Sequence, residues 1–310
     1  MNEYIPTIIA GTLAGTAARL VMLHVDYRQY PGYPHGYVTH LSLGFIAAAL
    51  GAVAVPAILK PDYTAVTFLA LAATQFREVR SIERKTLEHL DEKELVKRGS
   101  DYIEGIARTF EARNYLVMLT SLLTSIAFQL GQAPAALLIA LLTIAFSRSL
   151  MAGETIGDIC SVVPARLWFK NTVLMVDEIG MMTVGLKEMR EKILREGLAV
   201  LIIPKDPNAR ATIHDLGQRA AIAHTAAVIM GTKKDVDIPE FTPVARKNPD
   251  TGAVGLYIVP VEKDLEALIL AVKRTPVLES ARSKPLKTEA GRLASFGRRS
   301  AVGRRQKKIS

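Results

Sequence analysis

The stretch VTHLSLGFIAAALGAVAVPAIL, residues Val38–Leu59, contains no Asp, Glu, Lys or Arg. It is long enough to cross a bilayer as a helix, which takes about 20 mostly apolar residues. The pattern repeats outward from it: Ile5–His24 has one charged residue, and Asn114–Ser147 has none. A soluble domain would interleave its charges, because each surface helix needs a polar face. The sequence therefore predicts a helical membrane domain and excludes a single soluble globule.

The apolar runs predict about five transmembrane helices. They cover residues 5–24, 38–59, 63–76, 114–130 and 134–151, and the last two are joined by a tight hairpin at 131–133. The run 63–76 is short for a span, so four spans with a re-entrant 63–76 is the alternative. Lys and Arg gather in 77–113 and after residue 148, and such residues favour the cytoplasmic side. We expect both segments in the cytoplasm and, with five spans, the N-terminus outside.

Two features of the first predicted span have a physical meaning. Gly11 and Gly15 form a GxxxG pattern, which lets helix backbones approach closely in lipid. We expect it to pack helices within one chain, and a homodimer seam is the alternative. Arg19 is costly inside a membrane and is expected to snorkel or to pair with Asp26, close to His24. A role of Arg19 in an ion or proton path is the other interpretation.

Residues 77–113 form a polar segment with nine basic and nine acidic side chains. Apolar residues recur there at helical spacing and are interrupted at Gly99-Ser100, which predicts an amphipathic helix in two pieces. The second piece contains an unbroken hexapeptide made of Tyr102, Ile103, Glu104, Gly105, Ile106 and Ala107. With this hexapeptide, set between hydrophobic helices and a longer cytoplasmic part, the chain resembles the YIEGIA family of membrane proteins from endospore-forming Firmicutes.

The resemblance covers about residues 1–275. It implies a sporulation-linked protein of the forespore or mother-cell membrane. It also implies work in spore-envelope assembly together with a small protein subunit of capping type. The family supplies no catalytic residues to carry across, so we interpret the hexapeptide as a packing element or a partner contact.

The sequence pattern of the C-terminal part predicts a small cytoplasmic α/β domain with a mixed sheet. Short apolar, β-branched runs predict strands at 173–176, 198–203, 244–247 and 254–259, with a hairpin turn at 248–252. Helices are expected at 186–196, from Asp206 to about residue 226, and at 262–273. We therefore expect three parts: a transmembrane domain over 1–160 that includes the polar segment 77–113, the α/β domain over 161–278, and a tail over 279–310.

No catalytic or metal-binding pattern is found in the chain. The P-loop, GxSxG, HExxH and CxxC motifs are absent, and Asp177-Glu178 follows its strand without a phosphate-binding loop. Glu154 and Asp158 are expected to pair with nearby arginines rather than to act as an acid and a base. His214 and His224 lie ten residues apart on a predicted helix and have no further ligands beside them. We predict no enzyme, no cofactor and no metal.

The tail accounts for the basic character of the protein. Residues 280–310 hold ten of the 39 basic residues and one of the 30 acidic residues, so the remainder has 29 of each. Its composition predicts disorder, and on a membrane protein its simplest partner is anionic lipid rather than nucleic acid.

These observations together predict a multi-pass, non-enzymatic scaffold or assembly protein of the cell membrane that recruits a small protein partner at its cytoplasmic face. A small channel or transporter component with a regulatory domain is the alternative, and the chain could also form homo-oligomers.

Overall fold

The computed structural model describes residues 4–26, 34–60, 63–76, 78–150, 153–235, 238–282 and 288–289. The chain divides into two compact units. The helical unit comprises residues 1–87 and 106–153, and the sheet-containing unit comprises residues 88–105 and 154–310. Residues 88–105 thus belong with the C-terminal half of the chain, although they lie between two apolar stretches in the sequence. Most of the predicted tail lies outside the described residues.

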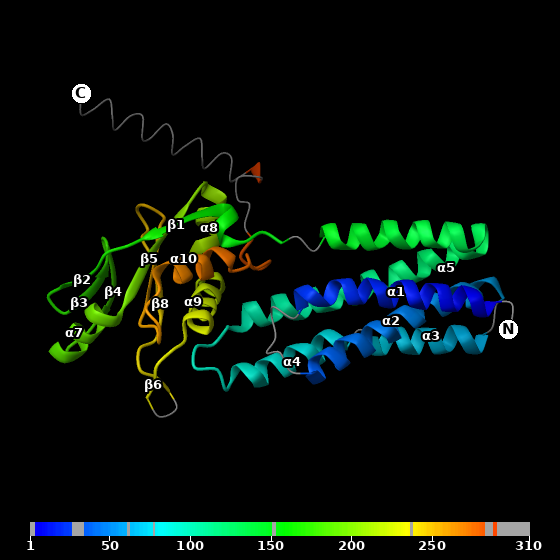
Figure 1. Cartoon of the computed structure of the whole chain (residues 1–310), viewed down its shortest axis with the longest axis horizontal. Helices are drawn as coiled ribbons and strands as arrows, with labels where there is room; N and C mark the ends of the chain where they lie inside the picture. The colour runs from blue at the N-terminus through cyan, green and yellow to red at the C-terminus, as the bar shows by residue number, and fades with distance from the viewer. Residues whose placement is uncertain are drawn as a thin grey trace, which may run out of the picture. The chain divides into compact units, whose positions relative to one another are not determined.

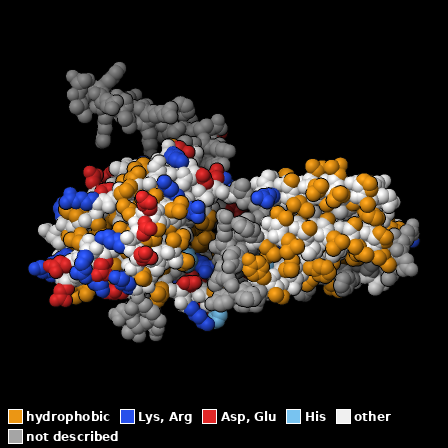
Figure 2. Space-filling view, in the orientation of Figure 1, with side chains coloured by type: hydrophobic (Ala, Val, Ile, Leu, Met, Phe, Trp, Pro, Cys, Tyr) orange, Lys and Arg blue, Asp and Glu red, His pale blue; other side chains and the backbone are white. Residues whose placement is uncertain are grey.

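The helical unit is built from α1 (Ile5–Asp26), α2 (Pro34–Leu59), α3 (Tyr63–Phe76), the first part of α4 (Val79–Asp91) and most of α5 (Ser100–Leu150). Figure 2 shows that the visible face of this unit is largely hydrophobic and carries few charged side chains. Leu13 and Leu141, for example, are 65% and 59% exposed. A large apolar surface of this kind fits contact with lipid better than contact with water.

Within the described part of the chain, three helices are long and apolar enough to cross a membrane: Ile5–Leu23, Gly36–Leu59 and Ser100–Leu150. These helices indicate that the unit associates with a membrane. The third is kinked, because Gly131 (φ −138°, ψ 18°) and Gln132 (φ 57°, ψ −160°) leave helical geometry. The chain reverses its direction there, as the predicted hairpin requires (Figure 1).

The expected count of about five spans is not supported by helix length and composition. Two of the expected spans are the two arms of α5. A third, α3, has only 14 residues. At 1.5 Å per residue it is about 21 Å long, while the hydrocarbon core of a bilayer is about 30 Å thick.

The second unit contains two main sheets. The larger has the strand order β1-β5-β9-β8, with β1 (Cys160–Pro164), β5 (Leu198–Pro204), β9 (Val254–Ile258) and β8 (Val244–Lys247). The smaller is a meander of β2 (Leu167–Lys170), β3 (Val173–Val176) and β4 (Ile179–Thr183), and β6 (Lys234–Asp235) pairs separately with β7 (Ile238–Pro239). The helices are α6 (Ile156–Ile159), α7 (Lys187–Glu196), α8 (Pro207–His214), α9 (Leu216–Met230) and α10 (Leu265–Arg274).

The prediction of a mixed sheet is wrong. Every strand pair in the described part of the chain is antiparallel. The predicted hairpin at 248–252 is present, and it places its second strand, β9, directly beside β5. The first strand, β8, runs in the same direction as β5, but β9 lies between them, so no parallel pair forms.

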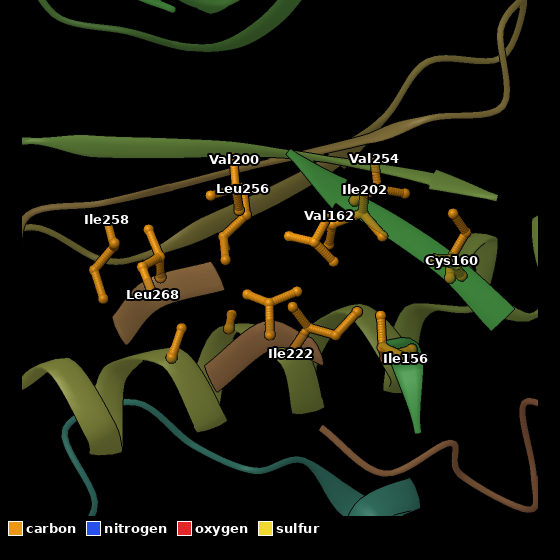
Figure 3. Close-up of a cluster of buried hydrophobic side chains, with 14 of the residues drawn as sticks. Ile156, Cys160, Val162, Val200, Ile202, Ile222, Val254, Leu256, Ile258 and Leu268 are labelled. Carbon is orange, nitrogen blue, oxygen red and sulfur yellow. The ribbon is translucent and has the colours of Figure 1, made fainter. Parts of the chain in front are cut away.

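The larger sheet is buried on both faces, because successive side chains of a strand point to opposite sides. One face meets α6, α8, α9 and α10. Figure 3 shows this core, in which Val200, Leu256 and Ile258 from the strands approach Ile222 of α9 and Leu268 of α10. The other face packs on the meander, and its core includes Leu174, Val176, Ala199 and Tyr257. The domain therefore has three layers: helices, the four-stranded sheet and the meander.

Local predictions in this domain are mostly confirmed. The strands at 173–176 and 198–203 and the helix at 186–196 are present, as are the last two strands. The helix expected from Asp206 to about residue 226 is instead two helices, because Asp215 ends α8 and caps α9 through a hydrogen bond from the Gln218 backbone N–H. Strands β1, β2, β4, β6 and β7 are not among the strands predicted from the sequence.

Candidate functional site

A buried arginine forms the most unusual site of the helical unit. Arg19, near the end of α1, is fully buried. Its Nε donates to the backbone oxygen of His40 at 3.2 Å, and a terminal nitrogen lies 3.1 Å from His40 Nδ1. The guanidinium also stacks over the Phe110 ring, with its carbon 5.2 Å from the ring centroid. Snorkelling would place the Arg19 guanidinium in water, whereas here it is buried among side chains of the helical unit.

The local sequence makes room for this arrangement. Gly44 is on α2 one turn after His40, and a Cβ added there would lie only 2.3 Å from Arg19 Cγ. Because an arginine can only donate hydrogen bonds, His40 Nδ1 must accept, which places the proton of a neutral His40 on Nε2. The His40 and Phe110 rings pack in a tilted arrangement with centroids 4.7 Å apart, which helps to orient the His40 ring.

Three further polar side chains are buried in this unit near the arginine. Glu83 of α4 is 7% exposed and interacts electrostatically with Arg19. Burial raises the pKa of Glu83 to about 7, although the positive charge of Arg19 opposes the shift. Arg113 is 4% exposed, and Asn114 is completely buried on the α5 face that also carries Phe110, one turn earlier.

From the sequence, Arg19 is expected to snorkel or to pair with Asp26, and no local pattern points to His40 as its partner. Asp26 and His24 lie in α1, but their side chains are outside the described residues. His40 is 21 positions from Arg19, so only the packing of α2 against α1 brings the two together. The nearest signal in the sequence is that His40 and Gly44 share a helical face.

The glycines of the GxxxG pattern lie where α1 meets α2 and α5. A Cβ added to Gly15 would be 2.7 Å from Ala48 Cβ and 3.1 Å from the Val117 oxygen. A Cβ added to Gly11 would be 2.0 Å from Ser125 Oγ. These glycines thus face helices of their own chain.

The start of the family hexapeptide is anchored on α9 of the sheet-containing unit. The Tyr102 ring meets His224 edge-on, with ring centroids 6.3 Å apart. It also packs with a small buried cluster of Ala221, Leu278 and Ala281. Six residues before the hexapeptide, the Val96 oxygen accepts a hydrogen bond from His224 Nδ1 at 2.6 Å. The segment that precedes α5 is therefore fixed to α9 at several points.

The sequence of α9 explains why it can be covered on two sides. The helix LGQRAAIAHTAAVIM is apolar almost all round, and a helix of that kind has to be buried. Ile222, Ala226 and Met230 face the sheet. Ala221 and His224 face the segment that contains Tyr102. Residues 88–105 therefore complete the packing of the α/β domain.

The remaining hexapeptide residues differ in exposure. Ile103, Ile106 and Ala107 are buried, whereas Glu104 and Gly105 are half-buried. A Cβ added to Gly105 would meet no described atom within 4 Å. Space inside the described structure therefore does not explain why glycine stands at this position in a helix.

Gln218 of α9 holds the chain that follows α10. Its Nε2 donates to the Pro276 oxygen at 3.0 Å, and its Oε1 accepts from the Leu278 backbone N–H at 2.7 Å. The side chain is fully buried. These two hydrogen bonds hold Leu278 against Tyr102.

Glu154, Asp158 and Cys160, which the sequence could suggest as reactive groups, make contacts that stabilise the fold. Asp158 accepts hydrogen bonds from the backbone and hydroxyl of Thr155, and Glu154 pairs with Arg282 at 2.7 Å rather than with the expected arginines. Burial raises the pKa of Cys160 to about 12, which makes a nucleophilic role unfavourable. Among the described residues, no group of three or more His, Cys, Asp or Glu side chains could hold a metal ion.

Asp177 and Glu178 form the two-residue turn between β3 and β4. The Asp177 carboxylate accepts from the Arg166 backbone N–H at 2.8 Å, so it stabilises the meander. The turn borders a cleft of about 270 Å³, lined by Asp177, Glu178, Ile179, Leu201, Ile203, Asn248, Thr251 and Ala253. The cleft is partly apolar and open.

Comparison with known proteins identifies the family of the chain. The profile of the YIEGIA protein family matches residues 7–288. The chain is 44% identical over 285 residues to the uncharacterized protein YphB of Bacillus subtilis (strain 168), a match that covers 92% of this chain and 96% of the relative. No solved structure matches it. The chain belongs to the YIEGIA family.

Proposed function

We propose that this protein is a multi-pass membrane scaffold whose cytoplasmic α/β domain binds a small protein partner during assembly of the spore envelope. The apolar helices and the family membership support the membrane part of the proposal. The link to sporulation has its support in the family resemblance.

The proposed partner interaction is supported by a small apolar patch at the C-terminal end of α9. Val228, Ile229 and Val261 are 61%, 55% and 62% exposed. Val261 is held beside the helix end, because its backbone N–H donates to the Met230 oxygen at 3.3 Å. The face of this unit that Figure 2 shows carries many charged side chains of both signs. Aliphatic side chains grouped on such a surface are typical of a protein contact.

A pull-down from sporulating cells in mild detergent tests this proposal. Full-length wild type is expected to capture one small soluble protein, and the double variant Val228→Asp/Val261→Asp is expected to lose it. Leu186→Asp is the matched control, because Leu186 is also an exposed aliphatic residue, at 69%, but lies before α7. Capture that is equal for all three proteins would refute the patch as the contact. Expression outside sporulation, with no sporulation defect on deletion, would refute the biological setting.

We also propose that α1, α2, α3 and the two arms of α5 cross the membrane, with the sheet-containing unit in the cytoplasm. α3 follows α2 after a short connection and runs antiparallel to it in Figure 1, which supports a short third crossing. The test is labelling with a membrane-impermeant maleimide. Cysteine in place of Gln132, at the α5 turn, should react in intact cells, and cysteine in place of Lys93 should react only after permeabilisation. The reverse pattern would overturn the orientation.

The buried Arg19 site gives a reason to test a second function, a channel or transporter component. A polar cluster in a membrane helix bundle is often part of an ion or proton path. Flux of protons and small ions into liposomes that contain the purified protein would favour it. A scaffold should show no flux above that of empty liposomes.

A further inference from the structure

The cleft beside the β3–β4 turn combines apolar walls with two carboxylates. Leu201 and Ile203 of β5 point to the meander side of the larger sheet and line the cleft together with Ala253. Ile203 is 40% exposed there. Asp177 and Glu178 of the turn also line it, and no Lys or Arg is among the described residues that do. A cleft of this kind suits a ligand that is both apolar and positively charged.

Glu178 is the carboxylate that can meet such a ligand. Asp177 already accepts a hydrogen bond from the Arg166 backbone N–H at 2.8 Å. Glu178 is exposed. A cation of the same domain, Arg246 of β8, donates to two main-chain oxygens of β4 at 3.1 and 2.9 Å. Its guanidinium is therefore held at the edge of the meander.

The C-terminal tail contains a segment with the chemistry that the cleft requires. Residues 291–299, GRLASFGRR, carry the apolar side chains of Leu293 and Phe296 between three arginines, Arg292, Arg298 and Arg299. Phe296 is the only aromatic residue in 280–310. The final stretch, 300–310, has four further basic residues and no aromatic one. Residues 291–299 are thus the part of the tail that matches both the apolar walls and the carboxylate.

The tail starts close to the cleft. Arg282 pairs with Glu154 at 2.7 Å. Glu154 is six positions before Cys160, and four of the residues between them form α6, so the two are less than about 20 Å apart. Cys160 is paired with Pro204, the neighbour of Ile203 in β5.

The chain beyond Arg282 is long enough to reach the cleft. Phe296 is 14 positions after Arg282, a stretch that can span about 48 Å when it is extended. A segment attached by a connection of this length is present at an effective concentration on the order of 1 mM. A separate peptide of the same chemistry would have to be supplied at that concentration to compete, so the chain's own tail is the favoured occupant.

We propose that residues 291–299 bind in the cleft of their own chain. The Phe296 ring covers Leu201 and Ile203, and an arginine of the segment lies beside Glu178. Binding removes the ring and the two aliphatic side chains from water and places a positive charge next to an exposed carboxylate.

Site-specific photo-cross-linking of the purified full-length protein tests this proposal. Phe296 is replaced by the photoreactive analogue p-benzoylphenylalanine, and the protein is irradiated in a neutral detergent at low ionic strength. We expect the main cross-links to join residue 296 to peptides of the same chain that contain 201–203 or 253. Glu178→Lys should lower their yield by about fivefold, because it replaces an attraction with a repulsion.

Glu188→Lys is the matched control, because Glu188 is an exposed carboxylate on α7 of the same unit and does not line the cleft. It should leave the yield unchanged. Ile203→Gln, a change in β5 rather than in the turn, should lower the yield as Glu178→Lys does. Urea unfolding, followed by the fluorescence of Trp168, confirms that each variant is folded under the cross-linking conditions.

Three results would overturn the proposal. Cross-links to peptides outside the cleft, or to detergent alone, would show that the segment does not bind there. Cross-links between two chains, visible as a covalent dimer, would show that the occupant comes from a second copy. Equal yields for the Glu178, Ile203 and Glu188 variants would show that the cleft does not hold the segment.

Discussion

Replacing Gln218 with leucine should destabilise the α/β domain strongly. The two side chains have similar size, so the change removes hydrogen bonds without leaving a large cavity. Gln218 bonds the Pro276 oxygen at 3.0 Å and the Leu278 backbone N–H at 2.7 Å, and it is fully buried. Both main-chain groups would lose their partner. A buried group without a partner costs roughly 1–3 kcal/mol, and the Pro276 oxygen is only partly buried and should cost about 1 kcal/mol, so we expect a loss of roughly 2–4 kcal/mol.

Urea unfolding of the full-length protein in detergent measures this loss. Trp168 is the only tryptophan of the chain and lies in β2, where its Nε1 donates to the Asp177 oxygen at 2.8 Å. Its fluorescence therefore reports on the sheet-containing unit. With a slope of about 2–3 kcal/mol per molar urea, the midpoint should fall by about 1 M.

Asn208→Leu is the matched control for this experiment. Asn208 is a half-buried carboxamide in the first turn of α8, and its oxygen accepts no hydrogen bond from the described residues. Its replacement should change the free energy of unfolding by less than about 1 kcal/mol. Equal urea midpoints for the Gln218 and Asn208 variants would show that the segment Pro276–Leu278 is not held in place by Gln218.

Three further perturbations test other parts of the structure. The free energy of unfolding of the detergent-solubilised protein should fall as the pH rises from about 4.5 to about 7, because the folded state keeps a proton on Glu83 that the unfolded chain releases. The total fall should be roughly 3 kcal/mol at most. Thermal melts of the Glu83→Gln variant should not show this dependence on pH. Gly51→Ala would place a Cβ 2.3 Å from the Met118 backbone oxygen and should cost roughly 1–3 kcal/mol, whereas Gly36→Ala on the same helix meets nothing within 4 Å and should leave the melting temperature unchanged. Cys160 should react with a thiol reagent at pH 8 only after denaturation, because burial raises its pKa to about 12, and rapid labelling of the folded protein would contradict its buried position.

The Arg19 site shows which of its features can be predicted from the sequence and which cannot. A lone arginine in an apolar run is visible at once, and its cost in a membrane marks it for attention. Its partner cannot be read in the same way, since His40 is equally compatible with the membrane interface. Asn114 is the first residue of the predicted span 114–130, and only the packing of α5 shows that its amide is buried and has no hydrogen-bond partner among the described residues.

The missed strands have a similar explanation. Leu167–Lys170 and Ile179–Thr183 are short and have no strict alternation, so their patterns are weak. Both flank Val173–Val176 through turns of two residues, where Asn171 and Asp177 adopt positive φ. Asn and Asp tolerate that conformation well, so the turns were a usable signal.

Four features can be predicted from the amino-acid sequence alone: the division into apolar helices and a sheet-containing domain, the hairpin at 131–133, the β8–β9 hairpin and the family. These features depend on composition, local periodicity and turn residues, which neighbouring positions encode. The antiparallel order of the sheet, the partner of Arg19 and the docking of Tyr102 on α9 become visible in the folded chain and not before. Each of these joins residues far apart in the chain, and their pairing depends on the sum of many weak contacts that no local pattern records.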